Sequence, residues 1–438
     1  MKRYPKYKDT GVPWLGQVPA HWEVAPAYIV ASTTKRAVSV SKLKGLKIAH
    51  YSIPNVQEFG TAQIEDGDSI DSSKVLVEGP CVLVSRLNPR KRTVALANVH
   101  PDADLTVCSG EFIKFSSKKT DALEWLERFY VSDAAASFIE SLVISATKSH
   151  GRADPHVVKR MQVGVPPDAE LKRLVEVLRK QVNTIDSAIS SQQRMIELLK
   201  ERRSAIITQA VTKGLDPNSK MKDSGVPWLG KVPAHWEVKR LRHLVQIKAS
   251  NVDKKIVEGE PAVRLCNYTD VYYNERIVMG PEYMEASASA DQIKKLNLKV
   301  GDVIITKDSE EPDDIGIPAC VYETAPDLVC GYHLALLRPN KPSSGPFIAR
   351  AISSLPSKFQ FHLSARGVTR FALGYHGIAD LLLALPPDQE LLAICDFIDK
   401  ALAAMDSTIT SQEQMIELLK ERRSAIITQA VTGQIDVR

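Results

Sequence analysis

Apolar residues recur with heptad spacing in two long segments of the chain, residues 168–212 and residues 388–432. In the first segment the a positions hold Val175, Val182, Ile189, Ile196 and Ala210, and the d positions hold Leu178, Ile185, Gln192, Leu199 and Ile206. In the second segment the a positions hold Cys395, Leu402, Ile409, Ile416 and Ala430, and the d positions hold Ile398, Met405, Gln412, Leu419 and Ile426. A seam held over about five heptads predicts a coiled coil. The alternative is a pair of ordinary amphipathic helices packed on a globular core.

Both segments carry start and stop signals for a helix. Asp168 and Asp388 each follow a Pro-Pro pair, and a carboxylate at this position accepts hydrogen bonds from the free N–H groups of the first turn. Gly214 and Gly433 lie just beyond the last apolar positions, where helices end readily. The sequence therefore predicts two long helices with defined ends.

The direction of the second helix follows from the reach of the linker. Residues 213–222 can span at most roughly 33 Å, whereas each helix of about 45 residues is roughly 65 Å long. The second helix must therefore run back along the first, which predicts an antiparallel coiled coil with one domain toward each end and pseudo-twofold symmetry. Polar residues interrupt its seam and are expected to fix register at some cost in stability: Gln192, Gln412, Arg203 and Arg423. We expect Gln192 and Gln412 to meet at the centre.

The segments between the helices, residues 24–166 and 238–386, contain short β-rich runs separated by Gly, Pro, Asn and Asp. Helical stretches interrupt these runs, so we expect mixed α/β domains. The predicted division of the chain is 1–166 for the first domain, 167–213 for the first helix, 214–386 for the linker and second domain, and 387–438 for the second helix and tail.

The chain is one module written twice. Residues 9–24 and 223–238 are identical at 14 of 16 positions, and residues 195–212 and 415–432 both read MIELLKERRSAIITQAVT. The middles diverge almost completely. Packing alone tolerates drift in apolar identity, so unchanged helix ends suggest that both copies meet the same partner surface; recent duplication is the alternative. The divergent middles suggest one scaffold that reads two different targets.

Composition places the chain in a broad class of proteins but does not identify its function. A hydrophobic fraction of 44% with 25% charged residues is typical of a globular protein, and the net charge of +5 permits nucleic-acid binding without requiring it. The six cysteines are scattered without a C-x-x-C pair, which disfavours disulfides and zinc and fits a reducing cytoplasm. No apolar run is long enough for a membrane span or a secretory signal.

These features together resemble the specificity subunits of type I restriction-modification systems. The likeness rests on the twin GVPWLGxVPAHWEV segments, GDVIITKDS at 301–309, GVTRFAL at 367–373 and the ELLKERRSAIITQAVTG helix end, and it extends over the whole two-half layout. The first half departs from the pattern: Thr147–His150, then Gly151 and Arg152, stand where the second half has GVTR.

The resemblance implies that each middle is a target recognition domain for one half of a bipartite double-stranded DNA site. It also implies that the repeated helices dock two methyltransferase subunits, and that restriction subunits join through the complex. The assembled complex would be an adenine-specific DNA methyltransferase and ATP-dependent endonuclease. S-adenosylmethionine, ATP and magnesium would belong to the partner subunits.

Catalytic motifs are missing from the sequence. The Pro-Pro pairs at 166–167 and 386–387 lack the polar and aromatic flanks of a methyltransferase loop, and we find no P-loop, glycine-rich cofactor fingerprint or metal-ligand cluster. We therefore predict a chain that is not an enzyme by itself and holds no cofactor or metal. The alternative from another class is an architectural coiled-coil protein with paired protein-binding domains.

Polar and basic residues around two loops of each middle are the candidates for DNA contacts, because such side chains bind phosphates and base edges. In the first domain they are Arg86, Asn88, Arg90, Lys91, Arg92, Lys148, Ser149, His150 and Arg152. In the second domain they are Lys307, Ser309, Arg366, Thr369, Arg370, Tyr375 and His376. For any one residue the alternative is an ordinary solvated side chain.

Candidates for partner contacts lie in the repeated helix ends: Glu201, Arg202, Arg203, Glu421, Arg422 and Arg423. The alternative is that these charges face solvent. The repeated tryptophans, Trp14, Trp22, Trp228 and Trp236, are interpreted as anchors that close each domain on the helices, with partner contacts as the alternative.

Overall fold

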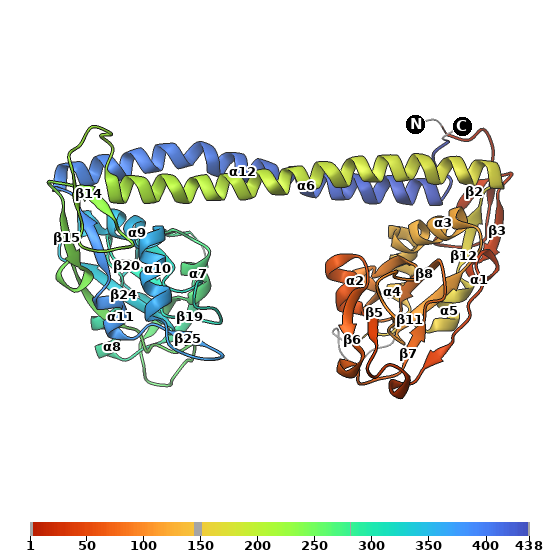
Figure 1. The fold of residues 1–438 in the computed structure, drawn as a ribbon. Coiled ribbons are helices and arrows are strands. Elements are labelled where there is room, and N and C mark those ends of the chain that lie inside the picture. Colours follow the sequence, from red (N-terminus) through yellow and green to blue (C-terminus); the bar gives the residue numbers. More distant parts are fainter. Residues whose placement is uncertain (1–2, 144–150, 281, 437–438) are drawn as a thin grey trace. The chain divides into compact units, whose positions relative to one another are not determined.

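The computed structural model describes residues 3–143, 151–280 and 282–436 (Figure 1). The chain divides into two compact units. Unit 1 comprises residues 1–193 and 413–438, and unit 2 comprises residues 194–412. Each unit contains one α/β module together with part of each of the two long helices, α6 and α12. Module 1 is the part of unit 1 that holds β1 to β12, and module 2 is the part of unit 2 that holds β13 to β26.

The elements of unit 1 begin and end as follows. The strands are β1 (Tyr7–Asp9), β2 (Gln17–Pro19), β3 (Glu23–Pro26), β4 (Ala37–Val38), β5 (Lys47–Tyr51), β6 (Gln63–Asp66), β7 (Lys74–Leu76), β8 (Cys81–Ser85), β9 (Val94–Ala97), β10 (Leu105–Cys108), β11 (Phe112–Ser116) and β12 (Gln162–Val165). The helices are α1 (Ala27–Val30), α2 (Ile53–Phe59), α3 (Thr120–Val131), α4 (Asp133–Ser141) and α5 (Pro155–Arg160), with short turns η1 (Val40–Lys42), η2 (Gly67–Ser69) and η3 (Pro89–Lys91). The long helix α6 (Asp168–Lys213) begins in unit 1 and ends in unit 2.

Unit 2 is built from the following elements. The strands are β13 (Met221–Asp223), β14 (Lys231–Pro233), β15 (Glu237–Arg240), β16 (Val245–Ala249), β17 (Ala262–Cys266), β18 (Arg276–Ile277), β19 (Met284–Ser287), β20 (Val303–Thr306), β21 (Asp308–Ser309), β22 (Pro318–Val321), β23 (Leu328–Cys330), β24 (Leu334–Pro339), β25 (Phe371–Ala372) and β26 (Leu382–Leu385). The helices are α7 (Tyr268–Tyr272), α8 (Ala290–Leu296), α9 (Gly345–Ser353), α10 (Leu355–Ser364) and α11 (Tyr375–Ala379), with turns η4 (Leu241–His243) and η5 (Pro342–Ser344). Helix α12 (Asp388–Val431) begins here and ends in unit 1.

The two modules share the pairing pattern of their central strands. In module 1, β8 pairs antiparallel with β11 and β9, while β5 pairs parallel with β10 and antiparallel with β6. In module 2, β20 pairs antiparallel with β24 and β22, while β17 pairs parallel with β23 and antiparallel with β19. The strands that extend these sheets differ between the modules. In module 1, β4 and β7 extend the sheet that contains β5, whereas in module 2, β16 and β18 extend the sheet that contains β20. The predicted mixed α/β class, with a long helix after each module, is confirmed.

Each module has its own hydrophobic cores. The central strands β8 and β20 are buried along their whole length, as expected for continuous apolar runs covered on both faces. Helix α3 places Trp125 and Phe129 in one core with Val82, and helix α9 places Phe347 in another with Val303. None of the hydrophobic clusters formed by described residues includes side chains of both units.

The long helices have 46 residues (α6) and 44 residues (α12). In unit 1 the start of α6 shares a core with the end of α12, through Leu174, Leu178, Ala430 and Val431. In unit 2 the end of α6 shares a core with the start of α12, for example through Ile207 and Ile398. Within each unit the two helices therefore run antiparallel, as predicted.

Ion pairs across the two helices set their register. In unit 1 Arg423 Nε lies 2.9 Å from Asp186 Oδ1, and in unit 2 Arg203 Nε lies 3.0 Å from Asp406 Oδ1. Both arginines therefore bridge the two helices, as a role in fixing register requires. Counting along both helices from the first pair places Gln192 opposite Glu417 of its own unit. This register does not support the predicted approach of Gln192 to Gln412, because an antiparallel pair is positioned by its strongest cross-helix contacts and not by the midpoints of its helices.

Trp22 and Trp236 are anchors at the helix starts, as predicted. Both indoles are fully buried, and each donates from Nε1 to a glutamate in the first turn of a long helix, at 3.0 Å to Glu170 and 3.1 Å to Glu390. Trp14 instead stacks on Phe138 with ring centroids 3.7 Å apart. Trp228 is 37% exposed, so it is a surface residue and not a buried anchor.

We expect Glu170→Ala to destabilise unit 1 by about 1–3 kcal/mol, because it leaves buried donors without an acceptor. Glu170 is 8% exposed and accepts hydrogen bonds from Tyr4 Oη (2.6 Å) and Trp22 Nε1, and it contacts His21 Nε2 at 2.7 Å. Burial alone raises the pKa of Glu170, but these hydrogen bonds outweigh it and hold the pKa below the ordinary 4.5. Its contribution should therefore be full above about pH 4.5 and be lost as the pH falls further.

Peptide-resolved hydrogen exchange in urea measures this effect unit by unit. The matched variant is Glu390→Ala in unit 2, where the glutamate side chain is more exposed and pairs with His235 and Trp236. We expect a smaller loss of protection there. Equal losses in both units would contradict the role given to burial.

Candidate nucleic-acid interface

The basic loop of module 1 follows the buried strand β8. Its chain turns sharply, because Asn88 and Arg92 both adopt φ +48°, on either side of the short turn η3. The backbone N–H of Asn88 donates to the carbonyl of Gly151 (2.8 Å), and Leu87 forms an isolated β-bridge with Arg152. The structure thus joins the two segments that the sequence predicted as separate loops.

Arg86 and Arg152 share one carboxylate. Arg86 Nε lies 2.9 Å from Glu111 Oε2, and Arg152 Nη2 lies 3.3 Å from Glu111 Oε1. Partial burial raises the pKa of Glu111, but the hydrogen bond and charge of Arg152, together with Arg86, outweigh it and leave the pKa below its ordinary value. Arg86, Arg152 and Glu111 together therefore carry one net positive charge. A positive charge held in an ordered loop suits a contact with a phosphate or a base edge.

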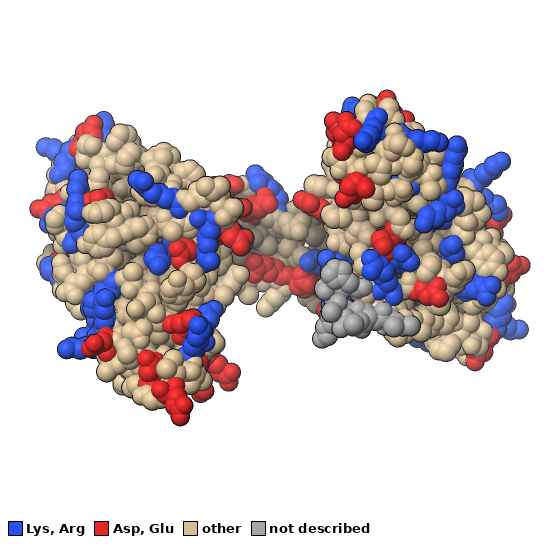
Figure 2. Space-filling view, turned by 90° about the horizontal axis from the view of Figure 1, so that it is seen from below, with Lys and Arg blue, Asp and Glu red and all other residues tan. Residues whose placement is uncertain are grey.

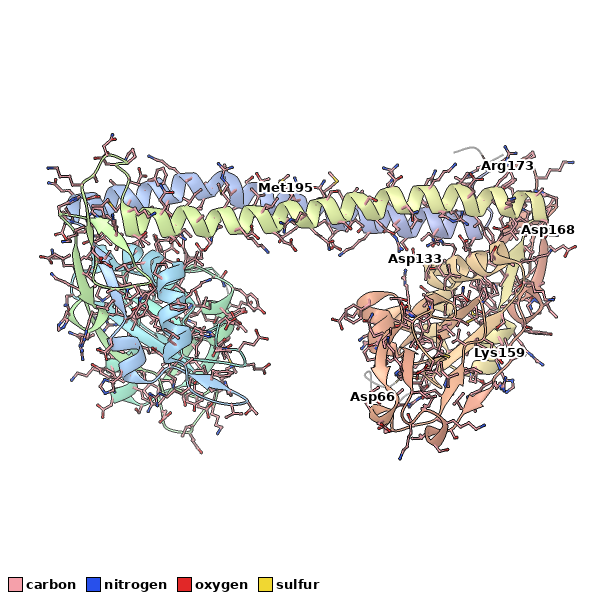
Figure 3. The ribbon with its side chains drawn as sticks, in the orientation of Figure 1. Asp66, Asp133, Lys159, Asp168, Arg173 and Met195 are labelled. Carbon is pink, nitrogen blue, oxygen red and sulfur yellow. The ribbon has the colours of Figure 1, made fainter. Side chains whose placement is uncertain are left out.

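The remaining cations of this loop differ in their surroundings. Arg90 and Lys91 are exposed, and Lys91 Nζ contacts Gln57 Oε1 at 3.3 Å. Arg92 points to the end of α12, where its Nη1 lies 2.6 Å from Asp133 Oδ1 and 3.3 Å from Ser424 Oγ. Asp133, labelled in Figure 3, begins α4. Arg92 therefore ties module 1 to α12, whereas Arg90 and Lys91 are exposed and form no ion pair with a described carboxylate.

Three further candidates of the first domain, Lys148, Ser149 and His150, lie outside the described residues. Their neighbour Arg152 is exposed. The position of Arg152 beside Arg86 shows where the second predicted loop rejoins the first.

In module 2 the counterpart segment contains Lys307 and strand β21. Strand β21 pairs with β25, so Asp308 faces Ala372 and Ser309 faces Phe371. This pairing brings the segment beside the turn of residues 366–370. Ser309 itself is 9% exposed, which makes it a poor contact residue.

The turn of residues 366–370 is the most exposed part of this site. Arg366, Thr369 and Arg370 are all exposed, and Val368 at the tip is 92% exposed. The turn is closed by a β-bridge between Arg366 and Ala372. Its cationic and hydroxyl side chains and its apolar tip suit contacts to DNA, including the methyl group of thymine.

Tyr375 and His376 lie at the start of the short helix α11, close in sequence to this turn. Tyr375 is 58% exposed, and His376 Nδ1 lies 3.9 Å from Asp380 Oδ2. Both side chains are therefore available to a ligand.

Sequence reasoning missed four aromatic residues that gather here, Tyr268, Tyr272, Tyr332 and His333. Tyr268 and Tyr272 stack with centroids 5.6 Å apart. A hydrogen bond from Tyr272 Oη to Asp314 (2.7 Å), followed by burial, raises the pKa of Tyr272 to about 12. Lys307 Nζ lies 5.7 Å from the centroid of the exposed Tyr332 ring. The available signal was the Gly-Tyr-His run directly after β23, where a polar aromatic pair follows a buried strand.

Arg370→Ala tests whether this turn reads a base or a phosphate. For a base-edge contact we expect a loss of about 1–3 kcal/mol in DNA binding, with relaxed preference at one position. For a phosphate contact we expect a similar loss on all sequences and a shallower dependence on salt. Binding to matched and single-substituted duplexes over a range of salt distinguishes them. If neither affinity nor preference changes, Arg370 is not part of the site.

The residues at the helix ends that were predicted to contact a partner protein fall into two groups. Glu201, Arg202, Glu421 and Arg422 are exposed. Arg203 and Arg423 are instead engaged within their own units, and Arg203 also pairs with Glu275 of module 2. The exposed residues are thus the available members of the predicted partner surface.

The surface charge is mixed on the face that Figure 2 shows. Lys and Arg side chains are spread over both units with Asp and Glu among them, and no continuous basic field covers either unit on this face. Recognition would therefore depend on individual loops more than on bulk charge.

Within residues 3–143, 151–280 and 282–436, none of the helices has both the length and the apolar character that crossing a bilayer requires. The same residues contain no cluster of three or more His, Cys, Asp or Glu side chains arranged to hold a metal ion.

Comparison with known proteins confirms the resemblance seen in the sequence. No protein-family model matches the chain. It is 24% identical over 208 residues to the type I restriction enzyme MjaVIII specificity subunit of Methanocaldococcus jannaschii, covering 45% of this chain and 44% of that protein. It is 40% identical over 68 residues to the type I restriction enzyme EcoBI specificity subunit of Escherichia coli, covering 16% of this chain and 14% of that protein.

The fold agrees with this likeness. A chain from a solved structure, described as the structural basis of complex assembly and conformational transition of the type I restriction-modification system, superposes with a TM-score of 0.67. It is 16% identical, with 95% of this chain and 99% of that chain covered. In sequence, the chain spans about half the length of the curated relatives it matches first.

Proposed function

We propose that the chain is the DNA sequence-specificity subunit of a type I restriction-modification complex and that it reads a bipartite site. The observation that carries the proposal is the repetition of one scaffold with different side chains at the same place. In both modules the segment after the central strand, β8 or β20, joins the segment before the last short helix, α5 or α11. Module 1 presents Arg86 and Arg152 there, and module 2 presents Lys307 and Arg370.

Two scaffolds that share their central strand pairings but carry different contact residues suit the recognition of two different half-sites. Ordered arginines and lysines position a protein on phosphates, and the same residues read guanine edges in the major groove. The similarity to two type I specificity subunits supports this proposal of DNA recognition.

The repeated helix ends are proposed to dock two copies of one partner, a methyltransferase subunit. Part of their identity is explained inside the chain, because Ile207, Ala210 and Val211 are buried against module 2 and their counterparts against module 1. Thr208 and Thr428 also accept from backbone N–H groups of Leu355 and Asp133.

Burial within the chain does not explain why the exposed residues of the two repeated helix ends are also identical. Met195, Leu198, Arg202, Ala205 and Gln209 are all exposed and follow one another at helical spacing along one face of α6. We call these five residues the α6 stripe; the position of Met195 is labelled in Figure 3. The α12 stripe consists of the identical exposed residues Met415, Leu418, Arg422, Ala425 and Gln429. An apolar and basic stripe at this spacing suits a helix of a partner protein.

The chemistry of the complex is assigned to the partners. We propose that methyltransferase subunits hold S-adenosylmethionine and that restriction subunits use ATP and magnesium. The purified chain alone is then expected to show neither methyl transfer nor DNA cleavage. Methyl transfer by the chain without partners would overturn this assignment.

Co-expression with the methyltransferase subunit of the host tests the docking surface. We expect Leu198→Asp combined with Leu418→Asp to abolish co-purification and site-specific methylation, since two charges enter an apolar contact. The matched control is Ser187→Asp combined with Ser407→Asp, at exposed positions outside the repeated block. Capture of unrelated proteins with no methyltransferase would instead support an architectural coiled-coil protein.

A further inference from the structure

Three segments of module 2 meet beside the exposed turn of residues 366–370. The backbone N–H of Lys307 donates to the carbonyl of His333 (2.9 Å), and the N–H of Leu373 donates to the carbonyl of Lys307 (2.9 Å). Lys307 therefore lies between the His333 segment and the chain that returns from Arg370. These bonds hold the side chains of all three segments at one edge of the module.

His333 has an unusual backbone. Its φ is +68°, and the only other described non-glycine residues with positive φ are Asn88 and Arg92 of the basic loop in module 1. Such a conformation costs free energy in a residue with a Cβ, so it persists where the surrounding structure enforces it, often at a binding site. All three residues lie in the candidate interface.

The imidazole of His333 is held by one carboxylate. Its Nδ1 lies 2.5 Å from Asp308 Oδ2 and 3.4 Å from Arg370 Nη2. The contact to Asp308 is much the shorter, so in the neutral form of the ring the geometry places the proton on Nδ1, where it donates to Asp308. The second ring nitrogen, Nε2, is then a hydrogen-bond acceptor.

We propose that His333, oriented by Asp308, is a specificity-determining residue of the second module that reads an exocyclic amine in the major groove. An acceptor at Nε2 matches the N6 amine of adenine or the N4 amine of cytosine and mismatches the O4 of thymine and the O6 of guanine. Arg370 beside it supplies donors for a neighbouring guanine or phosphate. This inference rests on the proposed function and adds a residue and a base chemistry to it.

The neighbouring side chains support contact with DNA. The His333 side chain is 30% exposed and that of Asp308 is 13% exposed, so the ring is accessible while its orienting carboxylate is sheltered. The exposed Tyr332 ring lies 4.0 Å from the His333 ring, and Lys307 lies over Tyr332. A cation, an aromatic face and an oriented acceptor thus adjoin the turn that carries Arg370.

His333→Gly in the full chain, assembled with its methyltransferase partner, tests the proposal. Glycine tolerates positive φ, so the backbone of the site is preserved while the acceptor is removed. Competition between the cognate duplex and duplexes substituted at single positions gives the readout. We expect discrimination at one adenine or cytosine of one half-site to fall on the order of 10- to 100-fold, with the other half-site unaffected.

Asp308→Asn tests whether Asp308 orients the His333 ring for base recognition. It keeps the shape of the orienting side chain but removes the charge that fixes the ring, so the loss of discrimination should fall at the same base position. The control is His243→Ala, at an exposed histidine of module 2 that belongs to none of these three segments.

A merely structural role of His333 would lower affinity for all duplexes equally and leave the ratios unchanged, which would overturn the proposal. A wild-type complex that methylates no bipartite site would instead overturn the proposed function itself. The two failures are therefore distinguishable.

Discussion

If the proposed function holds, replacing residues 24–166 with the corresponding segment of a type I specificity subunit is expected to change one half of the methylated DNA site and leave the other half unaltered. The physical reason is the separation of the cores, because no hydrophobic cluster of described residues draws on both units. A new module 1 therefore leaves the packing of module 2 untouched. Methylation-aware sequencing of the host genome reads the result directly.

Helix α4 makes two of the contacts with the retained chain that the incoming segment must reproduce. The backbone N–H of Asp133 donates to Thr428 Oγ1 (3.0 Å), and any residue other than proline can supply that donor. Phe138 stacks on the retained Trp14. We expect exchanged segments with an aromatic residue at this position to give active complexes. Segments with alanine there should give weaker ones that still read the same site.

A change in both half-sites would contradict the modular interpretation. It would mean that the two modules do not read DNA independently. Exchange of residues 238–386 is the mirror experiment, and it should alter only the half-site that the first exchange leaves unchanged.

The long helices and their direction could be predicted because they depend on local rules. Heptad spacing, Asp168 and Asp388 at the starts, and a linker too short to span a helix fix the type, start and direction of both. The meeting of Gln192 with Gln412 was inferred from helix midpoints. Register is a tertiary property, set here by Arg203 with Asp406 and Arg423 with Asp186, and one sequence does not show which charged residues will pair.

The candidate interface was predictable only in outline. The basic loop after β8 and the turn before α11 were visible as polar runs beside apolar strands, but their mutual contact depends on strand pairing between distant segments. Sequence reasoning also could not separate Arg92, which binds Asp133, from Arg90, which is exposed. His333 was missed because its orientation by Asp308 depends on the pairing of Lys307 with the segment after β23.

Lengthening both long helices by four residues is expected to lengthen the gap between the two half-sites while both half-sites keep their sequence. Four helical residues add roughly 6 Å, which corresponds to about two base pairs at roughly 3.4 Å each. Because α6 and α12 each run without a break from one unit into the other, added turns cannot be absorbed in a loop. The methylated motif in cells that carry the lengthened subunit is the readout.

The cross-helix register selects the point of insertion. Insertions after Arg194 and after Gln414 lie within two residues of the boundaries of the two units. They therefore leave the pairs of Asp186 with Arg423 and of Arg203 with Asp406 within their units. Four added residues rotate the following helix by roughly 40° at 3.6 residues per turn. A second variant with seven added residues in each helix keeps the heptad phase and lengthens the helices by roughly 10 Å.

Insertion into one helix alone is the control, since it shifts one helix past the other and should abolish methylation. The two matched insertions should give different gaps, longer for seven residues than for four. An active complex whose gap is the same in wild type and in both variants would show that the helices do not set the distance between half-sites. In that case flexible loops of the modules, and not the helix pair, would have to position the two contacts on DNA.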